Sequence, residues 1–290
     1  MNVLSSESRE ILSTPDTTGV PAAKAALRRR RILVNCIRVL ILVVFIGGWQ
    51  FLTSVGIIDQ FFWGQPSGIW NQLITWVTQG TAQGPLWEQI AATLLEAILG
   101  FVIGVVLGVI FGILLGRNRF LADVLGIYIK ALNSIPRVVL GPIFVIGLGL
   151  GIQSKVALAA VLVFFIVFFN AFQGVREVDR NLLANARILG ASERQLSNSV
   201  IIPSALTWIF ASLHTSFSFA LVGAVVGEFL GSTQGIGLMI QNAGATFNAN
   251  GVFAGMLILA VVAMVSEAVI TALENRLIRW RPNTVSDVTI

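Results

Sequence analysis

A few charged side chains in this 290-residue sequence stand inside long apolar stretches, where they could bind a charged solute. Charged groups are costly in an apolar phase, and they usually mark a solute pathway or a partner charge. Lys130 and Arg137 are seven residues apart, so they would share one face of a helix if Pro136 only kinks it. Such a cationic face would suit a small anion. The alternative is that Lys130 extends to a polar surface or pairs with Glu96 or Glu267.

Three further polar residues are pathway candidates: Asn133, His214 and Glu228. Asn133 and His214 could instead form hydrogen bonds between helices, as polar side chains in apolar segments commonly do. Glu228 lies near the end of an apolar stretch, in the segment GEFLG. Its alternatives are to stabilise a dimer or to meet water.

The residue patterns of enzymes, nucleotide sites and metal sites are missing. None of the three lysines, Lys24, Lys130 and Lys155, follows a glycine, so the sequence has no Walker A loop. His214 is the only histidine and Cys36 the only cysteine, which excludes paired-histidine metal sites and an internal disulfide. We therefore expect no catalytic residue, no metal, and no cofactor bound by this chain.

The composition is that of a membrane protein. Hydrophobic residues make up 56% of the chain and charged residues only 11%, whereas a soluble domain has about a quarter of its residues charged. The net charge of +5 could suggest a nucleic-acid partner, but so few charges in total argue against one. We expect an all-α polytopic membrane protein.

Six segments are long and apolar enough to cross a membrane, which takes about 20 residues each. They are 32–56, 89–115, 122–149, 154–174, 205–229 and 252–277. Arginines precede the first span, follow the last, and occur between spans two and three and between spans four and five, whereas 57–88 and 230–251 contain neither lysine nor arginine. By the positive-inside rule both termini are cytoplasmic, with Lys155 as the exception on the outer side.

The rest of the chain divides around these spans. We expect a disordered basic cytosolic tail at 1–31, a transmembrane domain at 32–282 and a cytosolic C-terminal tail at 283–290. A cleaved signal peptide fits less well, because the first apolar run is long and no A-x-A-like site follows it. The tryptophan-rich segment QPSGIWNQLITWVTQG predicts a helix in the outer membrane interface.

Span two carries a glycine at every fourth position: Gly100, Gly104, Gly108, Gly112 and Gly116. This spacing makes a narrow groove along one side of the helix, which lets another helix backbone come close. The stripe predicts tight helix packing in preference to a role in solute binding.

The cytosolic segment 175–204 contains two helix signals. REVDRNLLANARILG has apolar residues at helical spacing and ends in Gly190, which can adopt the left-handed conformation of a helix end. Ser192 and Gln195 form a capping box for a second short helix, and Pro203 begins the next span. The segment therefore predicts two short helices joined at an angle at Gly190.

This loop resembles the one before the penultimate span in permease subunits of bacterial ABC importers, whose pattern is E-A-A-x-x-x-G, nine residues, then I-x-L-P. Ala184, Asn185 and Ala186 fall on E-A-A, Gly190 on the glycine, and Val200, Ile202 and Pro203 on I-x-L-P. Ala184 replaces the family's glutamate and Asn185 its alanine, which bears on a salt bridge to the ATPase but not on the helix–turn–helix shape. QPSGIW, SIPRVVLGPIF and GEFLGSTQGIGLMI resemble the nitrate/sulfonate/taurine branch, so the resemblance covers about residues 60–282.

The resemblance implies a type I ABC importer permease fold, with six transmembrane helices and a coupling helix between helices 4 and 5. Two copies, expected as a homodimer, would form the pathway in the bacterial inner membrane. Separate ATPase subunits would use ATP and move the loops, and a periplasmic substrate-binding protein would deliver the solute. The residues expected to couple to the ATPase are Ala184, Asn185, Ala186, Gly190, Ala191, Val200, Ile202 and Pro203.

The expected solute is a small anion of the sulfonate, taurine or nitrate type. The same branch includes permeases for thiamine-pyrimidine precursors and riboflavin-like compounds, which the motifs do not separate. A secondary transporter without an ATPase is another alternative, against which the loop spacing argues. A membrane scaffold with no transport of its own is a third.

Overall fold

The computed structural model describes residues 19–277, and these are almost entirely helical. They belong to two compact units, 1–60 and 61–290. The described part of the first unit is essentially one helix, α1 (Gly19–Ser54), whose apolar residues are mostly exposed, as expected for side chains that face lipid.

The prediction of a disordered tail at 1–31 is wrong for residues 19–31, because α1 already begins at Gly19. The segment that follows is rich in alanine and arginine, two of the best helix formers, and its Pro21 falls in the first turn, where proline is tolerated. Residues 1–18 and the C-terminal tail expected at 283–290 lie outside the described residues.

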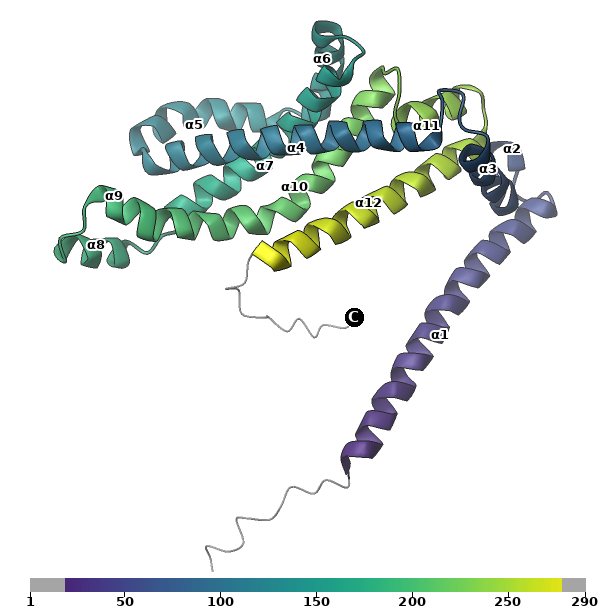
Figure 1. Cartoon of the computed structure of the whole chain (residues 1–290), viewed down its shortest axis with the longest axis horizontal. Coiled ribbons are helices and arrows are strands. Elements are labelled where there is room, and N and C mark those ends of the chain that lie inside the picture. The colour runs from purple at the N-terminus through teal and green to yellow at the C-terminus, as the bar shows by residue number, and fades with distance from the viewer. Residues whose placement is uncertain (1–18, 278–290) are drawn as a thin grey trace, which may run out of the picture. The chain divides into compact units, whose positions relative to one another are not determined.

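The remaining described elements are helices joined by short connections (Figure 1). In chain order they are α2 (Gln60–Trp63), α3 (Pro66–Thr78), α4 (Leu86–Arg117), α5 (Arg119–Ser134), the 3₁₀ turn η2 (Arg137–Leu140), α6 (Gly141–Leu148), α7 (Ile152–Arg176), α8 (Arg180–Ile188), α9 (Glu193–Leu196), the π-helical segment η3 (Ser197–Ile201), α10 (Ile202–Leu230), α11 (Ile236–Ala245) and α12 (Ala249–Leu277). Within residues 19–277, five helices are long and apolar enough to span a membrane, or six if a bent pair counts as one span. The expected all-α membrane architecture is confirmed.

The single helix expected over 122–149 is wrong. This span is the bent pair, and its two parts, Arg119–Ser134 and Arg137–Leu148, meet at 86°. Pro136 causes the break, because it has no N–H for the preceding turn and excludes Ile135 from the helical region, at φ −77° and ψ 128°. Lys130 and Arg137 therefore do not share one helix face.

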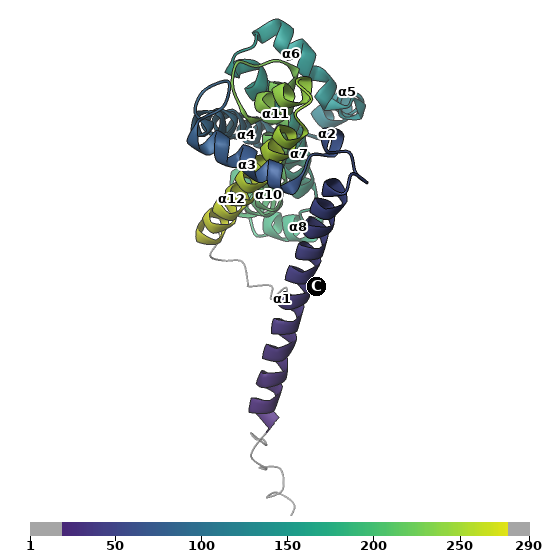
Figure 2. The same ribbon diagram turned by 90° about the vertical axis from the view of Figure 1, so that its right-hand side faces the viewer.

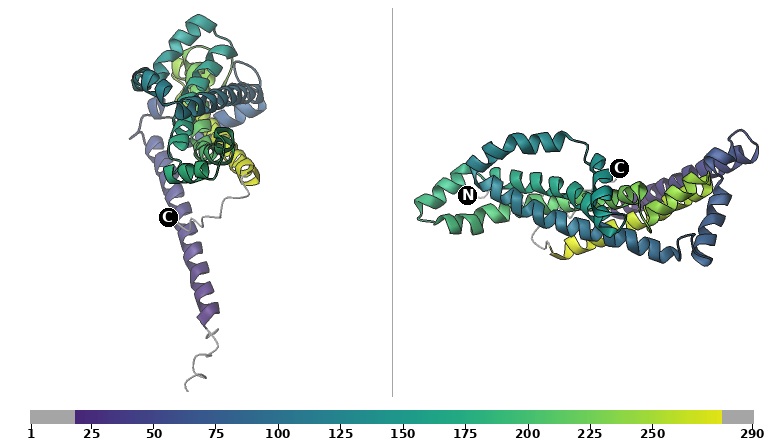
Figure 3. Two further views of the ribbon diagram at one scale, coloured as in Figure 1. Left: turned by 90° about the vertical axis from the view of Figure 1, so that its left-hand side faces the viewer. Right: turned by 90° about the horizontal axis from the view of Figure 1, so that it is seen from above.

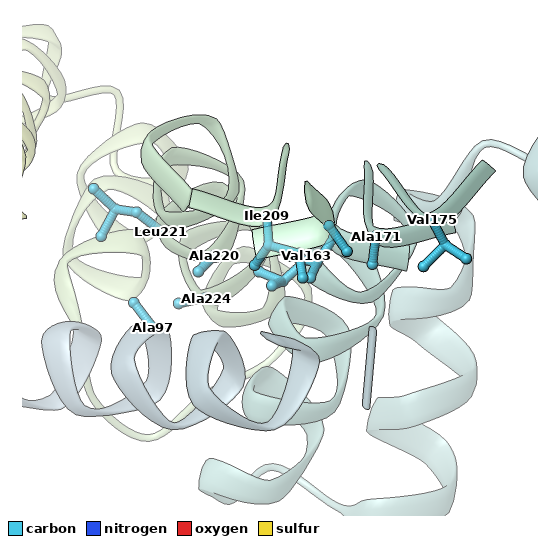
Figure 4. Close-up of a cluster of buried hydrophobic side chains, with 10 residues drawn as sticks. Ala97, Val163, Ala171, Val175, Ile209, Ala220, Leu221 and Ala224 are labelled. Atoms are coloured by element: carbon cyan, nitrogen blue, oxygen red, sulfur yellow. The ribbon is translucent and has the colours of Figure 1, made fainter. Parts of the chain in front are cut away.

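The centre of the second unit is formed by α4, α7 and α10, which pack along one another (Figure 1). Their buried residues make one apolar cluster that is rich in alanine and valine (Figure 4), including Ala97, Val163, Ala171, Ala220 and Ala224. Small side chains allow helices to approach closely, which is how association is achieved in lipid. α6 and α12 lie on opposite sides of this central group (Figures 1 and 2).

The glycine stripe of α4 faces α7. A Cβ added at Gly104 would lie 2.6 Å from the Cβ of Val163, and one added at Gly112 would lie 2.6 Å from the Cβ of Ala171. Gly100, Gly108 and Gly116 meet Ala159, Val167 and Val175 in the same way. Because these contacts are shorter than real Cβ atoms allow, only glycine fits along the stripe without moving α7.

The two ends of the second unit carry different elements. α8 and α9 project at one end, and α11 lies at the other (Figures 1 and 3). α3 is fixed to the start of α12 near α11, where the Asn250 Oδ1 accepts a hydrogen bond from the Gln65 backbone N–H at 2.9 Å. In chain order, α10 leads from α8 and α9 to α11.

Candidate functional site

The α8–α9 tip, residues 180–196, is a rigid turn. Asp179 caps α8 by accepting a hydrogen bond from the Asn181 N–H at 2.8 Å. Gly190 has φ +85°, the left-handed conformation predicted for it. The N–H of Gly190 donates to Arg187 and that of Ala191 donates to Ala186, which together form a Schellman motif.

The second half of the tip is also capped as predicted. Ser192 and Gln195 form the full capping box at the start of α9. Arg187 and Glu193 form an ion pair of 3.0 Å across the turn, but both side chains are more than half exposed, so it contributes only about 0–1 kcal/mol. The backbone motifs, more than this ion pair, keep the tip in one shape.

The prediction of two short helices in this loop is wrong in one respect. α9 is not separate from the following span, because it continues through η3 into α10 as one helix, Glu193–Leu230. Pro203 lacks an N–H, and the wider π turn directly before it is a way to accommodate that missing donor. The second half of the tip is thus the N-terminal end of the α10 helix itself.

The residues of the coupling motif are distributed over this structure. Ala184, Asn185 and Ala186 lie on α8, Gly190 and Ala191 in the turn, Val200 in η3, and Ile202 and Pro203 at the start of α10. Two apolar side chains of the tip are almost fully exposed: Ile188 is 83% exposed and Leu189 is 86% exposed. The sequence motif does not single out these two residues, although ILG ends the predicted helix.

The three pathway candidates near the broken span are not equivalent. Lys130 is exposed and borders a cavity of about 450 Å³ between α5 and α7, together with Asp123 and Arg176. Asn133 and Arg137 contact each other, since the Arg137 guanidinium donates a hydrogen bond to the Asn133 side chain. Arg137 also lies 4.7 Å above the ring of Phe165, a cation–π contact.

His214 lines a different cavity, of about 410 Å³, between α10 and α12. Its Nε2 is 3.3 Å from the Thr271 hydroxyl on α12. Ser218 and Glu267 add polar atoms to walls that are otherwise apolar. Among residues 19–277 there is no group of three or more His, Cys, Asp or Glu side chains placed to hold a metal ion.

Glu228 borders neither of these two cavities, because it is completely buried near the C-terminal end of α10. One carboxylate oxygen accepts a hydrogen bond from the Thr93 hydroxyl of α4 at 2.6 Å. The other accepts from the Gly237 backbone N–H in the first turn of α11, also at 2.6 Å. The carboxyl group therefore connects three helices.

Two side chains of α4 complete this arrangement. Thr93 accepts a hydrogen bond from the Ile236 N–H at 2.9 Å, and Gln89 accepts one from the Gly235 N–H at 2.8 Å. Helix N-termini have N–H groups without partners inside the helix. At α11, three successive groups of this kind are bound by side chains from α4 and α10.

Two more buried ionisable residues surround Glu228. The Glu96 carboxyl, which is 1% exposed, interacts electrostatically with that of Glu228. Lys155, at the start of α7, interacts electrostatically with both carboxyls and donates to the carbonyls of Leu150 and Gly151 at 2.6 and 3.1 Å. Lys155, which was expected as the exception on the outer side, is fully buried in the first turn of α7.

The sequence contains a signal for this cluster. Gln89, Thr93, Glu96 and Gly100 are spaced by four, three and four residues, so they lie on one helix face that continues the glycine stripe. Polar residues that continue a packed face are expected to meet other helices. The sequence does not show that this face of α4 contacts the start of α11.

Comparison with known proteins gives consistent matches. The profile of a protein family described as "Binding-protein-dependent transport system inner membrane component" matches residues 100–279. An aliphatic sulfonates transport permease of Bacillus subtilis (strain 168) is 32% identical over 241 residues, covering 82% of this chain and 85% of the relative. A taurine transport system permease protein of Escherichia coli (strain K12) is 30% identical over 240 residues, covering 82% and 87%.

A relative with a different printed substrate also matches. A riboflavin transport system permease protein of Chloroflexus aurantiacus (strain ATCC 29366 / DSM 635 / J-10-fl) is 37% identical over 202 residues, covering 70% of this chain and 75% of the relative. Among solved structures, a chain of an amino acid ABC transporter has a TM-score of 0.53 at 20% identity, covering 66% of this chain and 92% of that one. This last similarity concerns the fold.

Proposed function

The chain belongs to the family of binding-protein-dependent transport system inner membrane components, as the permease subunit of an ABC importer, and from this premise we propose that its α8–α9 tip receives force from a separate ATPase. α10 transmits that force across the membrane. The chain itself binds no ATP and no cofactor and catalyses no reaction. A second copy completes the pathway as a homodimer, with both termini cytoplasmic.

The observation that carries the proposal is the exposed apolar end of the tip. Ile188 and Leu189 are held at its apex by a Schellman motif and are almost fully exposed. Large apolar side chains displayed by a stiff turn mark a docking surface, because their burial by a partner is favourable, at about 25 cal/mol per Å². The partner implied by the family is the ATPase.

A charge at the apex tests this assignment. In Leu189→Glu, a carboxylate would have to be buried in the apolar contact, so we expect the ATPase subunit to be lost from the detergent-solubilised complex. The measurement is the ratio of ATPase to permease after affinity purification through the permease. Asn181→Glu is the matched control, because it adds the same group to the exposed first turn of α8, where helices favour acids.

The assignment of the tip fails if Leu189→Glu and Asn181→Glu retain the same amount of ATPase. Loss of the ATPase from both variants would equally contradict it, since the effect would then be one of added charge on α8.

We propose that the solute is a small organic anion of the sulfonate or taurine type. Two relatives with such substrates in their names align over 82% of the chain. Cationic groups are also available in the described residues: Lys130 is exposed beside a cavity, and the buried Nε of Arg137 has no hydrogen-bond partner there. A riboflavin-like solute is the second candidate, because the riboflavin permease relative is 37% identical.

Reconstitution distinguishes the two solutes. The permease, its ATPase and its binding protein are placed in proteoliposomes, with ATP at the ATPase side. We expect taurine or an alkanesulfonate to stimulate ATP hydrolysis and to be taken up, and riboflavin to do neither. Uptake of riboflavin alone would replace the anion assignment with the second candidate.

A further inference from the structure

The buried contacts at the start of α11 suggest a role in transport beyond stability. We propose that Gln89, Thr93 and Glu228 are positioning residues that fasten α11 to α4 and α10, so that the outer helix α11 moves with α10 when the tip is driven. We call these three residues the α11 latch. This inference rests on the proposed function, which gives α10 its role as the moving helix.

The first step is that α10 reaches from one end of the unit to the other. The continuous helix Glu193–Leu230 has 38 residues, a length of about 57 Å at 1.5 Å per residue. Its first residues belong to the α8–α9 tip, and Glu228 lies in its last turn. A displacement of the tip is therefore passed along a single helix to the Glu228 carboxyl.

The second step is that the peptide connection between α10 and α11 is a poor transmitter of motion. It runs from Gly231 to Gly235 without regular structure, and both glycines have positive φ, of +158° and +115°. Glycine-bounded segments of this kind bend easily. The latch does not depend on this connection, because the hydrogen bond between Glu228 and Gly237 joins the two helices directly.

The third step is that the latch is dry and sterically fixed. Gln89, Thr93 and Glu228 are each no more than 1% exposed, so water cannot replace a hydrogen bond that breaks. A Cβ added at Gly237 would lie 2.6 Å from the Val225 carbonyl oxygen, so α11 already touches the backbone of α10. A carboxylate at a helix N-terminus is also favoured by the helix dipole.

Substitutions at Thr93 give the most specific test of the α11 latch. Thr93→Val keeps the shape but removes both the donor to Glu228 and the acceptor for Ile236, whereas Thr93→Ser keeps the hydroxyl. Ser216→Ala is the matched control, because it removes an equally buried hydroxyl of α10 that donates only to its own helix, to the Ser212 carbonyl at 2.7 Å. The measurement is solute transported per ATP hydrolysed in proteoliposomes, a ratio that does not change when less protein folds.

We expect Thr93→Val to lower this ratio by about tenfold, the factor that one unsatisfied buried group is worth in an equilibrium constant. Thr93→Ser and Ser216→Ala should stay near wild type. Hydrogen exchange should be faster at Gly235–Gly237 in Thr93→Val alone. If Thr93→Val does not reach the membrane, Gln89→Met removes a different bond of the latch, to Gly235, and takes its place.

An unchanged ratio in Thr93→Val, or an equal loss in all three variants, overturns the role of the latch. Both results assume that wild-type protein couples uptake to ATP hydrolysis. Failure of the wild type to do so, with its ATPase and binding protein present, contradicts the proposed function instead. The two failures are therefore distinguishable.

Discussion

Gly190 sets the geometry of the tip, because it is the residue at which α8 ends and the chain reverses. Its φ of +85° lies in the left-handed region, and nothing lies within 4 Å of where a Cβ would stand. Space for a side chain is therefore not the constraint. The constraint is the backbone conformation, which favours glycine and, next to it, asparagine.

This distinction predicts opposite outcomes for two substitutions. Gly190→Val should open the Schellman turn, since a β-branched residue is strained there by about 1–2 kcal/mol, and uptake per ATP should fall. Gly190→Asn adds a side chain of similar size but tolerates the conformation, so it should retain most of the coupling. Both are measured by solute uptake and ATP hydrolysis in proteoliposomes. Equal coupling in the two variants would show that the conformation of Gly190 does not matter.

Single residues could be predicted from the sequence where the determinant is local. The left-handed Gly190 and the Ser192–Gln195 capping box follow from patterns within a few residues of each other. Glu228 and Lys155 depend on helices that are distant in the chain. Their burial could not be predicted, because no local pattern shows which helix ends will meet.

The pairing of α4 with α7 is the main packing feature among the elements of the second unit. Each glycine of the stripe contacts a residue of α7 that is itself small or β-branched, again at intervals of four. In lipid there is no hydrophobic drive between helices, so close van der Waals contact along this line holds the pair. The close contact therefore depends on the small and β-branched residues of α7 as much as on the glycines of α4.

A side chain in the stripe should force the two helices apart. We expect Gly108→Val to destabilise the permease by about 1–3 kcal/mol, as overpacking of a close-packed interior does. The measurement is the thermal unfolding midpoint in detergent. Gly126→Ala on α5 is the control, because nothing lies within 4 Å of its added Cβ.

A Gly108→Val variant as stable as the control would mean that α4 and α7 are not packed as closely as described.

The existence of the spans could be predicted from apolar length, and most of their ends agree to within a few residues. The exceptions are the starts of the first and fifth, where the helix begins about twelve residues before the predicted span. The shape of the third span could not, because a proline inside a membrane helix is compatible with a slight kink as well as with a break. Here the result is a bend of 86°. The separation of Lys130 from Arg137 follows from that bend.

At the scale of the whole molecule, the number of crossings determines which side each terminus occupies. Five long helices make six spans if the bent pair crosses the membrane once, and an even number predicts that the two ends of the chain lie on the same side. By the positive-inside rule, the arginine distribution predicts that this side is the cytoplasm. The proposed function requires this orientation, because the α8–α9 tip has to meet an ATPase in the cytoplasm.

Reporter fusions test the orientation directly. We expect green fluorescent protein to fluoresce at either terminus, and alkaline phosphatase to be active when fused after Gly80, in the connection between α3 and α4. Active phosphatase at either terminus would show that a span has been miscounted. An alkaline phosphatase fusion after Gly190 would then show on which side of the membrane the tip lies.

The π-helical segment Ser197–Ile201 has a consequence for the direction in which the tip faces. A π turn takes in about one residue more than an α turn, so this segment shifts the rotational phase between the two stretches of helix that it joins. If the same residues formed an ordinary α-helix instead, the extra residue would rotate Ile188 and Leu189 by about 100° around the axis. The direction in which the apex faces therefore depends on this wider turn, and a change that converted it to an α turn without removing a residue would direct an otherwise intact apex away from its partner.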